Sequence, residues 1–157
     1  MKRLLALTLI AACILLGMSC SSSPSATPEY VKDVVEYAEG TDAIVVYFVL
    51  ADSNGDETTA SGTVRLQMVQ EKTNYLTDKT STTTLYDKTF PVDKSDFHKT
   101  TVGTGAFERT RIICSFGRIA YSQFSVNPSG DFPSGDVIVE FTTESGRVLT
   151  GRTSILY

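Results

Sequence analysis

Two side chains of this chain could act together as a nucleophile and its base, the thiol of Cys114 and the imidazole of His98. A thiol becomes nucleophilic when a neighbouring base or cation lowers its pKa. Cys114, however, lies in an apolar, strand-like run from Thr110 to Phe116, and His98, the only histidine, lies in a polar segment. We therefore expect Cys114 to be a buried core residue and His98 to be a solvated loop residue. The sequence assigns no catalytic residue.

Oxygen-bearing side chains alternate at Asp52, Asn54 and Asp56, a spacing that can collect ligands around a calcium ion. An EF-hand loop would also require a glycine at position 57 and an acidic residue at position 63, where this chain has glutamate and threonine. The alternative is a tight turn between strands, in which these side chains cap their own backbone. We expect the turn and assign no metal and no cofactor, with calcium binding by these three residues left open.

Carbohydrate chemistry would need paired carboxyl groups or exposed aromatic rings. The eighteen acidic residues are scattered through turns and polar strand faces, which favours solubility as their role. Most of the seven tyrosines and eight phenylalanines fall at strand positions that face a core. Tyr75, Phe97 and Phe132 lie in expected loops and are the best candidates for exposed rings.

The N-terminal segment has the order of an export signal. Two cations precede an uncharged apolar run from Leu4 to Gly17, and the segment from Leu16 to Cys20 reads Leu-Gly-Met-Ser-Cys. This pattern resembles the lipobox signal peptide of prokaryotic lipoproteins. The resemblance implies that residues 1–19 are removed and that the sulfur of Cys20 receives a diacylglyceryl group. The alternative, an uncleaved transmembrane anchor, is disfavoured because about 20 apolar residues are needed to span the hydrocarbon layer.

Residues 20–29 are small, polar and interrupted by proline, which is typical of a flexible tether. Removal of residues 1–19 takes Lys2 and Arg3 with it, and leaves 138 residues with 12 cationic and 18 acidic side chains, a net charge of −6. An acidic surface disfavours binding to nucleic acid and to anionic lipid headgroups. We therefore expect an extracytoplasmic protein that is attached to the cell membrane or outer membrane through lipid on Cys20 alone.

The remainder, residues 30–157, reads as short strands separated by turns. Apolar residues on both parities predict a central strand over Ala43–Leu50, and Gly62–Gln70 alternates so that Val64, Leu66 and Met68 face inward. Residues 28–39 fit either a strand or a helix, and we favour the strand. We expect loops over residues 71–84 and 93–105. Further strands are expected at residues 84–90, 107–116, 119–126, 137–141 and 148–156.

About seven or eight short strands without a strong helix predict an all-β antiparallel sandwich. In this respect residues 30–157 resemble immunoglobulin-like and fibronectin type III domains, with Val31–Tyr37 and Ile44–Leu50 in place of the first two strands. Phe48 would take the place of the core tryptophan. The chain has no tryptophan, and its mature part has no cysteine pair, so the resemblance implies a fold and no functional residue.

Three functions fit these observations. The first is a non-enzymatic envelope lipoprotein whose sandwich binds an envelope protein or glycan through loops or an exposed strand edge. The second is an extracytoplasmic carbohydrate-active hydrolase, and the third is an accessory subunit or assembly factor of a membrane complex. The lack of a recognisable catalytic set favours the first.

Overall fold

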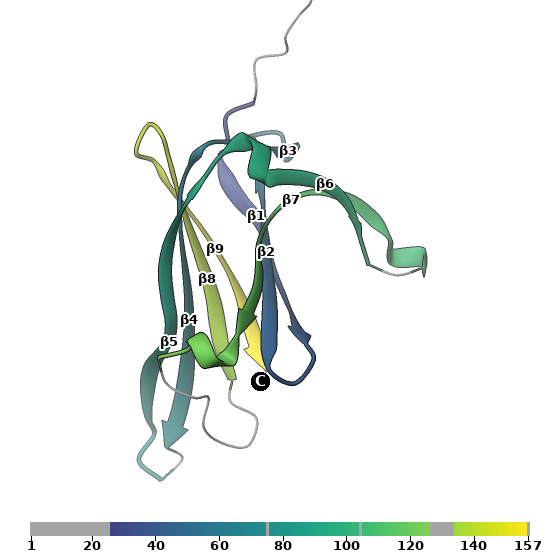
Figure 1. The fold of residues 1–157 in the computed structure, drawn as a ribbon. Helices are drawn as coiled ribbons and strands as arrows, with labels where there is room; N and C mark the ends of the chain where they lie inside the picture. The colour runs from purple at the N-terminus through teal and green to yellow at the C-terminus, as the bar shows by residue number, and fades with distance from the viewer. Residues whose placement is uncertain (1–25, 75, 104, 126–133, 157) are drawn as a thin grey trace, which may run out of the picture.

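The computed structural model describes residues 26–74, 76–103, 105–125 and 134–156 (Figure 1). The signal sequence, Cys20, the first part of the tether, Tyr75 and Phe132 lie outside the described residues. Among the residues that are described, no helix is long and apolar enough to cross a membrane.

Two antiparallel sheets make up the domain. The first sheet has the order β1 (Tyr30–Glu39), β2 (Ala43–Ala51), β7 (Arg109–Ala120), β6 (Phe97–Val102), with the two-residue strand β3 (Glu57–Thr58) also paired to β2. The second sheet has the order β5 (Lys79–Val92), β4 (Gly62–Asn74), β8 (Ser134–Thr143), β9 (Val148–Leu156). Within the described part of the chain, three short 3₁₀ turns connect strands, namely η1 (Lys94–Asp96), η2 (Gly105–Phe107) and η3 (Tyr121–Gln123).

This strand order confirms the predicted immunoglobulin-like sandwich. An immunoglobulin domain pairs its strands A-B-E-D in one sheet and C-F-G in the other. The first sheet has the order A-B-E-D when β1, β2, β7 and β6 are taken as A, B, E and D. The second sheet has the order C-F-G when β4, β8 and β9 are taken as C, F and G, and β5 is an additional strand beside β4.

The inner faces of both sheets form one hydrophobic core, and Phe48 lies at its centre. Its ring is fully buried and lies 5.7, 5.6 and 6.1 Å from the ring centroids of Phe97, Phe116 and Phe141. Phe97 and Phe116 come from the first sheet and Phe141 from the second, so Phe48 joins the two layers. Phe48 lies on the second strand, however, whereas the tryptophan of immunoglobulin domains lies on the third.

Several local predictions are confirmed. Residues 30–39 form a strand, so the helix alternative for this segment is wrong. β2 is buried along nearly its whole length, as expected of a central strand. Val64, Leu66 and Met68 are fully buried, while Arg65 on the opposite face of β4 is exposed.

Three predictions are wrong. The expected loop at residues 71–84 instead continues β4 and β5, which extend beyond β8 as a two-stranded ribbon paired from Lys72 with Ser81 to Asn74 with Lys79. The expected loop at residues 93–105 contains η1 and β6. The strand expected at residues 119–126 does not form, because β7 continues to Ala120 and η3 follows.

The sandwich is closed tightly where β1 meets β9. A Cβ atom added to Gly151 of β9 would lie 2.4 Å from Cγ1 of Val31, so only glycine permits this approach. Residues just before β1 also contact the domain, since the amide of Glu29 donates to the carbonyl of Ala51 at 2.8 Å and its carboxylate pairs with Arg147. Residues 26–29 of the predicted tether therefore lie against the domain.

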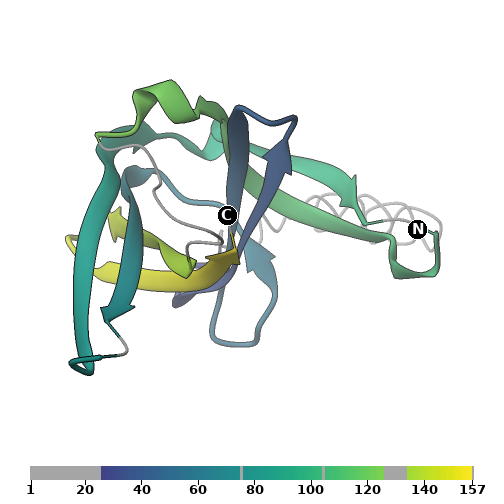
Figure 2. The ribbon, with the colours of Figure 1, turned by 90° about the horizontal axis from the view of Figure 1, so that it is seen from below.

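β6 and the first part of β7, residues 97–103 and 105–113, form an arm that projects from the body (Figures 1 and 2). The root of the arm is held by Arg111, whose guanidinium donates to the carboxylates of Glu57 and Asp33. The second oxygen of Glu57 accepts a bond of 2.6 Å from the amide of Ile112. The side chains of Arg111 and Glu57 are only 15% and 16% exposed, so this ion pair is well shielded and fixes the arm's direction.

Candidate binding site on the open side of the sandwich

The side of the sandwich between β5 and β7 is open because β6 leaves β7 early. β6 pairs with β7 from Arg109 to Cys114, and the last pair joins Phe97 to Cys114. Beyond this point β7 pairs with β2 on one side, up to Ala120. Within the described ranges, no strand pairs with its other side over residues 115–120. This part of β7 is a free edge in the middle of the domain.

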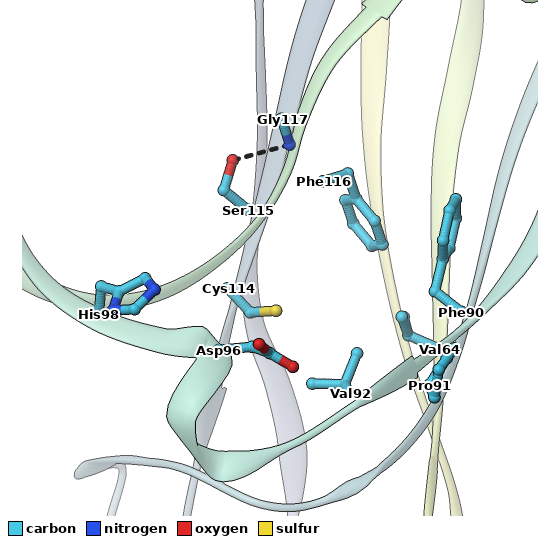
Figure 3. A pocket seen from close by; sticks show the side chains of 10 residues that line it. All are labelled: Val64, Phe90, Pro91, Val92, Asp96, His98, Cys114, Ser115, Phe116 and Gly117. Atoms are coloured by element: carbon cyan, nitrogen blue, oxygen red, sulfur yellow. Dashed lines mark hydrogen bonds between the residues drawn. The ribbon is translucent and has the colours of Figure 1, made fainter.

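A pocket of about 480 Å³ lies beside this free edge (Figure 3). Phe90 and Val92 of β5 line one wall, and Cys114 and Phe116 of β7 line the other, with Val64 of β4 behind them. The rings of Phe90 and Phe116 are partly buried, and their centroids are 5.7 Å apart. The pocket therefore exposes part of the hydrophobic core to solvent from the side.

A β-bulge shapes the edge of β7 at the pocket. Val45 of β2 pairs with Arg118 and Tyr47 pairs with Ser115, which leaves two residues of β7 opposite one of β2. Gly117, one of these two, has φ of +68°, a value that side chains other than glycine rarely adopt. Its amide donates to Oγ of Ser115 at 3.1 Å. The bulge bends β7 where β6 has departed, and this opens the pocket.

The segment after β7 closes the lower part of the open side. The amide of Ser125 donates to the carbonyl of Leu85 in β5 at 2.7 Å. The ring of Phe124 packs against Tyr86 and Tyr121, at 6.1 and 5.4 Å between centroids. The pocket is thus the part of the gap that β6 and this segment leave uncovered.

The polar groups of the pocket do not form a catalytic set. Burial, with a smaller contribution from the negative charge of Asp96, raises the pKa of Cys114 to about 12. His98 is exposed on β6 and its side chain also lines the pocket, but among the described residues no hydrogen bond joins its imidazole to Cys114, and it does not contribute to the pKa shift of the thiol. The thiol is therefore protonated at neutral pH. The prediction of a buried core cysteine is confirmed, whereas the expected loop around His98 is a strand.

We expect Cys114 to resist alkylation in the folded protein. With a pKa of about 12, the thiolate fraction at pH 8 is about 10⁻⁴, against roughly a quarter for a free cysteine. Iodoacetamide should thus modify native Cys114 about a thousandfold more slowly than the same residue in urea, as measured by mass spectrometry of the tryptic peptide. Equal rates in the two states would show that the thiol is accessible and ionised.

The residues considered for calcium form the expected turn. Oδ1 of Asp52 accepts the amides of Asn54 at 2.8 Å and Asp56 at 3.0 Å, and Gly55 between them has φ of +85°. Asp52 itself is buried, and its carboxylate thus caps its own backbone. No group of three or more histidine, cysteine or acidic side chains in the described residues is arranged to hold a metal ion.

The aromatic predictions are partly wrong. Phe97 was a candidate for an exposed ring, with packing against the core as the alternative, and the alternative is correct: it is buried against Phe48 because β6 enters the core at this residue. Among the described residues, the most exposed rings are instead those of Tyr30 and Tyr37, at 42% and 51% exposure. Sequence reasoning also missed the pocket, although one signal was present: Gly117 interrupts an apolar strand pattern, which is typical of a bulge.

Comparison with known proteins does not assign the chain to a family. No protein-family model matches it, and no curated protein matches it. Among solved structures, it is similar to the crystal structure of MtrC from Shewanella baltica OS185, with 10% sequence identity and a TM-score of 0.48. The similarity covers 80% of this chain and 21% of MtrC, so the chain spans about a fifth of that protein's length. A similarity at this level carries no inference about function.

Proposed function

We propose that this protein is a lipid-anchored, non-enzymatic binding module of the cell envelope, and that its open side accepts an extended segment of a partner protein as an added strand. The observation that carries the proposal is the free edge of β7 over residues 115–120, next to a pocket that reaches the hydrophobic core. The lipobox resemblance of residues 16–20 supports the envelope location.

A free strand edge presents backbone amides and carbonyls that can pair with another chain. Main-chain hydrogen bonds would supply affinity, and the pocket would supply specificity. Because side chains alternate along a strand, every second residue of the incoming segment would face the pocket. The walls formed by Phe90, Val92 and Phe116 would select apolar side chains at those positions. The intervening residues would face solvent.

The same geometry favours binding over hydrolysis. Glycoside hydrolysis requires two carboxyl groups on either side of the scissile bond. Of the described residues that line the pocket, Asp96 alone has a carboxylate. One of its oxygens already accepts the amide of Asp93 at 2.8 Å. The hydrolase alternative therefore gains no support from this pocket. The assembly-factor alternative agrees with strand addition, and differs from it in requiring co-purification with a defined membrane complex.

Site-specific crosslinking in intact cells would test the proposal. Benzoyl-phenylalanine is introduced at Ser115, an exposed residue on the free edge, and in a matched variant at Thr150, an exposed residue of β9 on the far side of the domain. We expect irradiation to give one defined adduct from position 115 and none from position 150. Mass spectrometry of the adduct should locate the crosslink in a segment with alternating apolar residues.

A pocket variant provides the second arm of the test. Phe90→Ser removes a pocket wall, whereas Thr89→Ala alters the exposed neighbour on the other face of β5. If a partner side chain fills the pocket, we expect the first variant to reduce the adduct about tenfold and the second to leave it unchanged. Thermal unfolding of both variants shows whether each is folded. Equal adduct yields from folded Phe90→Ser and wild type would contradict the proposed use of the pocket.

A further inference from the structure

A second hollow lies on the opposite face of the first sheet, between the arm and strands β1 and β2. It has a volume of about 360 Å³ and is separate from the pocket on the open side, with which it shares one lining residue, Ser115. Tyr37 and Tyr47 line it from the sheet, and Thr100, Thr101 and Ile113 line it from the arm. We call this hollow the tyrosine groove. We propose that the tyrosine groove is a binding site for a neutral saccharide.

The two tyrosines form an aromatic surface on one face of the sheet. Tyr37 pairs with Val45 and Val35 pairs with Tyr47, so the two tyrosines are diagonal neighbours across β1 and β2. Side chains in this relation are about 7–8 Å apart, close enough for both rings to contact one ligand. Tyr37 is 51% exposed and Tyr47 is half-buried. A tyrosine offers an apolar ring face together with a polar hydroxyl, which suits a ligand that is apolar on one face and hydroxylated at its edges.

The hydroxyl groups of the groove are available to a ligand. Neither tyrosine hydroxyl, nor the hydroxyls of Thr100 and Thr101, makes a hydrogen bond with any other described residue. Each can both donate and accept. A polyhydroxylated ligand matches such a set, because each of its hydroxyl groups can likewise donate and accept.

The lining of the tyrosine groove also excludes charged ligands. All its described lining residues are uncharged. The charges nearest to Tyr47, those of Arg111 and Asp33, are paired with each other, so a phosphate, a carboxylate or an ammonium group placed here would lose hydration without gaining an unpaired opposite charge. The combination of two aromatic rings, free hydroxyls and no charge therefore points to a neutral sugar rather than to an anionic glycan or a lipid headgroup.

The ion pairs of the arm hold the groove in shape. Arg111 bonds to Asp33 of β1 and Glu57 of β3, and so ties the arm to the same sheet that carries the tyrosines. Because the arm is already held in place, binding of a ligand does not have to pay the entropy of ordering it, and this preorganisation increases affinity. Burial raises the pKa of Tyr47, so its hydroxyl stays protonated and remains a donor.

Fluorine NMR of the protein labelled with 3-fluorotyrosine would test the inference. The probes are cellohexaose, maltohexaose and the hexamer of N-acetylglucosamine, each at millimolar concentration, with decaproline as a peptide probe because tyrosine-lined grooves also bind polyproline helices. Tyr→Phe variants assign the Tyr37, Tyr47 and Tyr30 signals. We expect at least one oligosaccharide to shift the Tyr37 and Tyr47 signals while the Tyr30 signal stays in place.

Two alanine variants of β1 then separate the groove from the rest of the surface. Tyr37→Ala should weaken oligosaccharide binding about tenfold or more, whereas Tyr30→Ala, a matched change of a similarly exposed tyrosine on the same strand, should leave it unchanged. Response to decaproline alone, no response to any saccharide, or equal weakening by the two variants would overturn the inference. Although Ser115 lines both sites, crosslinking from position 115 remains distinguishable from these results, because its expected adduct is a protein segment and not a saccharide.

Discussion

Replacement of Cys20 by alanine should abolish lipid attachment completely. In the lipoproteins whose signal this segment resembles, the diacylglyceryl group is joined through the cysteine sulfur, and alanine would offer no atom to which it could be attached. In cells labelled with radioactive palmitate, we expect the wild type to carry label and to have the size of the 138-residue mature chain. Cys20→Ala should carry no label and should retain residues 1–19, because cleavage of a lipobox signal follows lipidation in the proteins that it resembles.

The other two cysteines provide matched controls. Cys13 lies within the signal, and Cys114 is buried in the domain, so Cys13→Ser and Cys114→Ala should be labelled and cleaved as the wild type is. Partitioning into a detergent phase gives a second measurement. Each buried methylene of an acyl chain contributes about 0.8 kcal/mol to membrane binding, and the acidic domain adds no attraction to anionic lipid. Cleavage and label in Cys20→Ala equal to those of the wild type would refute the anchor.

Strand orientation could be predicted from the sequence wherever one face of a strand is buried. Val64, Leu66 and Met68 alternate with polar residues because side chains of a strand point alternately to its two faces. This alternation can be seen in a short stretch of sequence, since the polarity of each residue indicates whether that residue is buried. β2 was predicted to be central for the same reason, as its residues are apolar on both parities.

Strands that lie outside the core left no such pattern. The far end of the β4–β5 ribbon is polar, and it was therefore predicted to be a loop. Its residues pair with one another through their backbones, for example Lys72 with Ser81, and need no apolar face to do so. Threonine also has a high strand propensity. Hydrophobic periodicity detects burial and not pairing, and the same limit explains why β6 was missed.

The candidate site could not be predicted because it depends on where two strands separate. The free edge of β7 exists because β6 pairs with it only as far as Cys114. That endpoint is set by the direction of the arm, which Arg111 fixes by bonds to Glu57 and Asp33, 54 and 78 positions away in the sequence. Contacts of this range leave no local pattern. The local sequence feature that indicated the site was Gly117, a glycine within a strand pattern that is typical of a bulge.

Replacement of Phe48 by alanine should cause the largest loss of stability among the substitutions considered. Phe48 is fully buried and contacts the rings of Phe97, Phe116 and Phe141, so its removal leaves a cavity between the two sheets. Such substitutions cost about 3–5 kcal/mol of the free energy of unfolding, out of about 5–15 kcal/mol for a typical domain. The expected decrease in Tm is about 10–20 °C, measured by circular dichroism during heating.

Two further substitutions define what this result would mean. Phe48→Leu keeps most of the buried volume and should cost clearly less than Phe48→Ala. Tyr30→Ala removes an exposed ring and should change the free energy of unfolding by about 0.5 kcal/mol or less. Because Phe116 stacks on Phe48 and also lines the pocket, Phe48→Ala should weaken crosslinking from position 115 even at temperatures where the domain is folded. A decrease in Tm below about 3 °C would show that Phe48 does not join the two sheets.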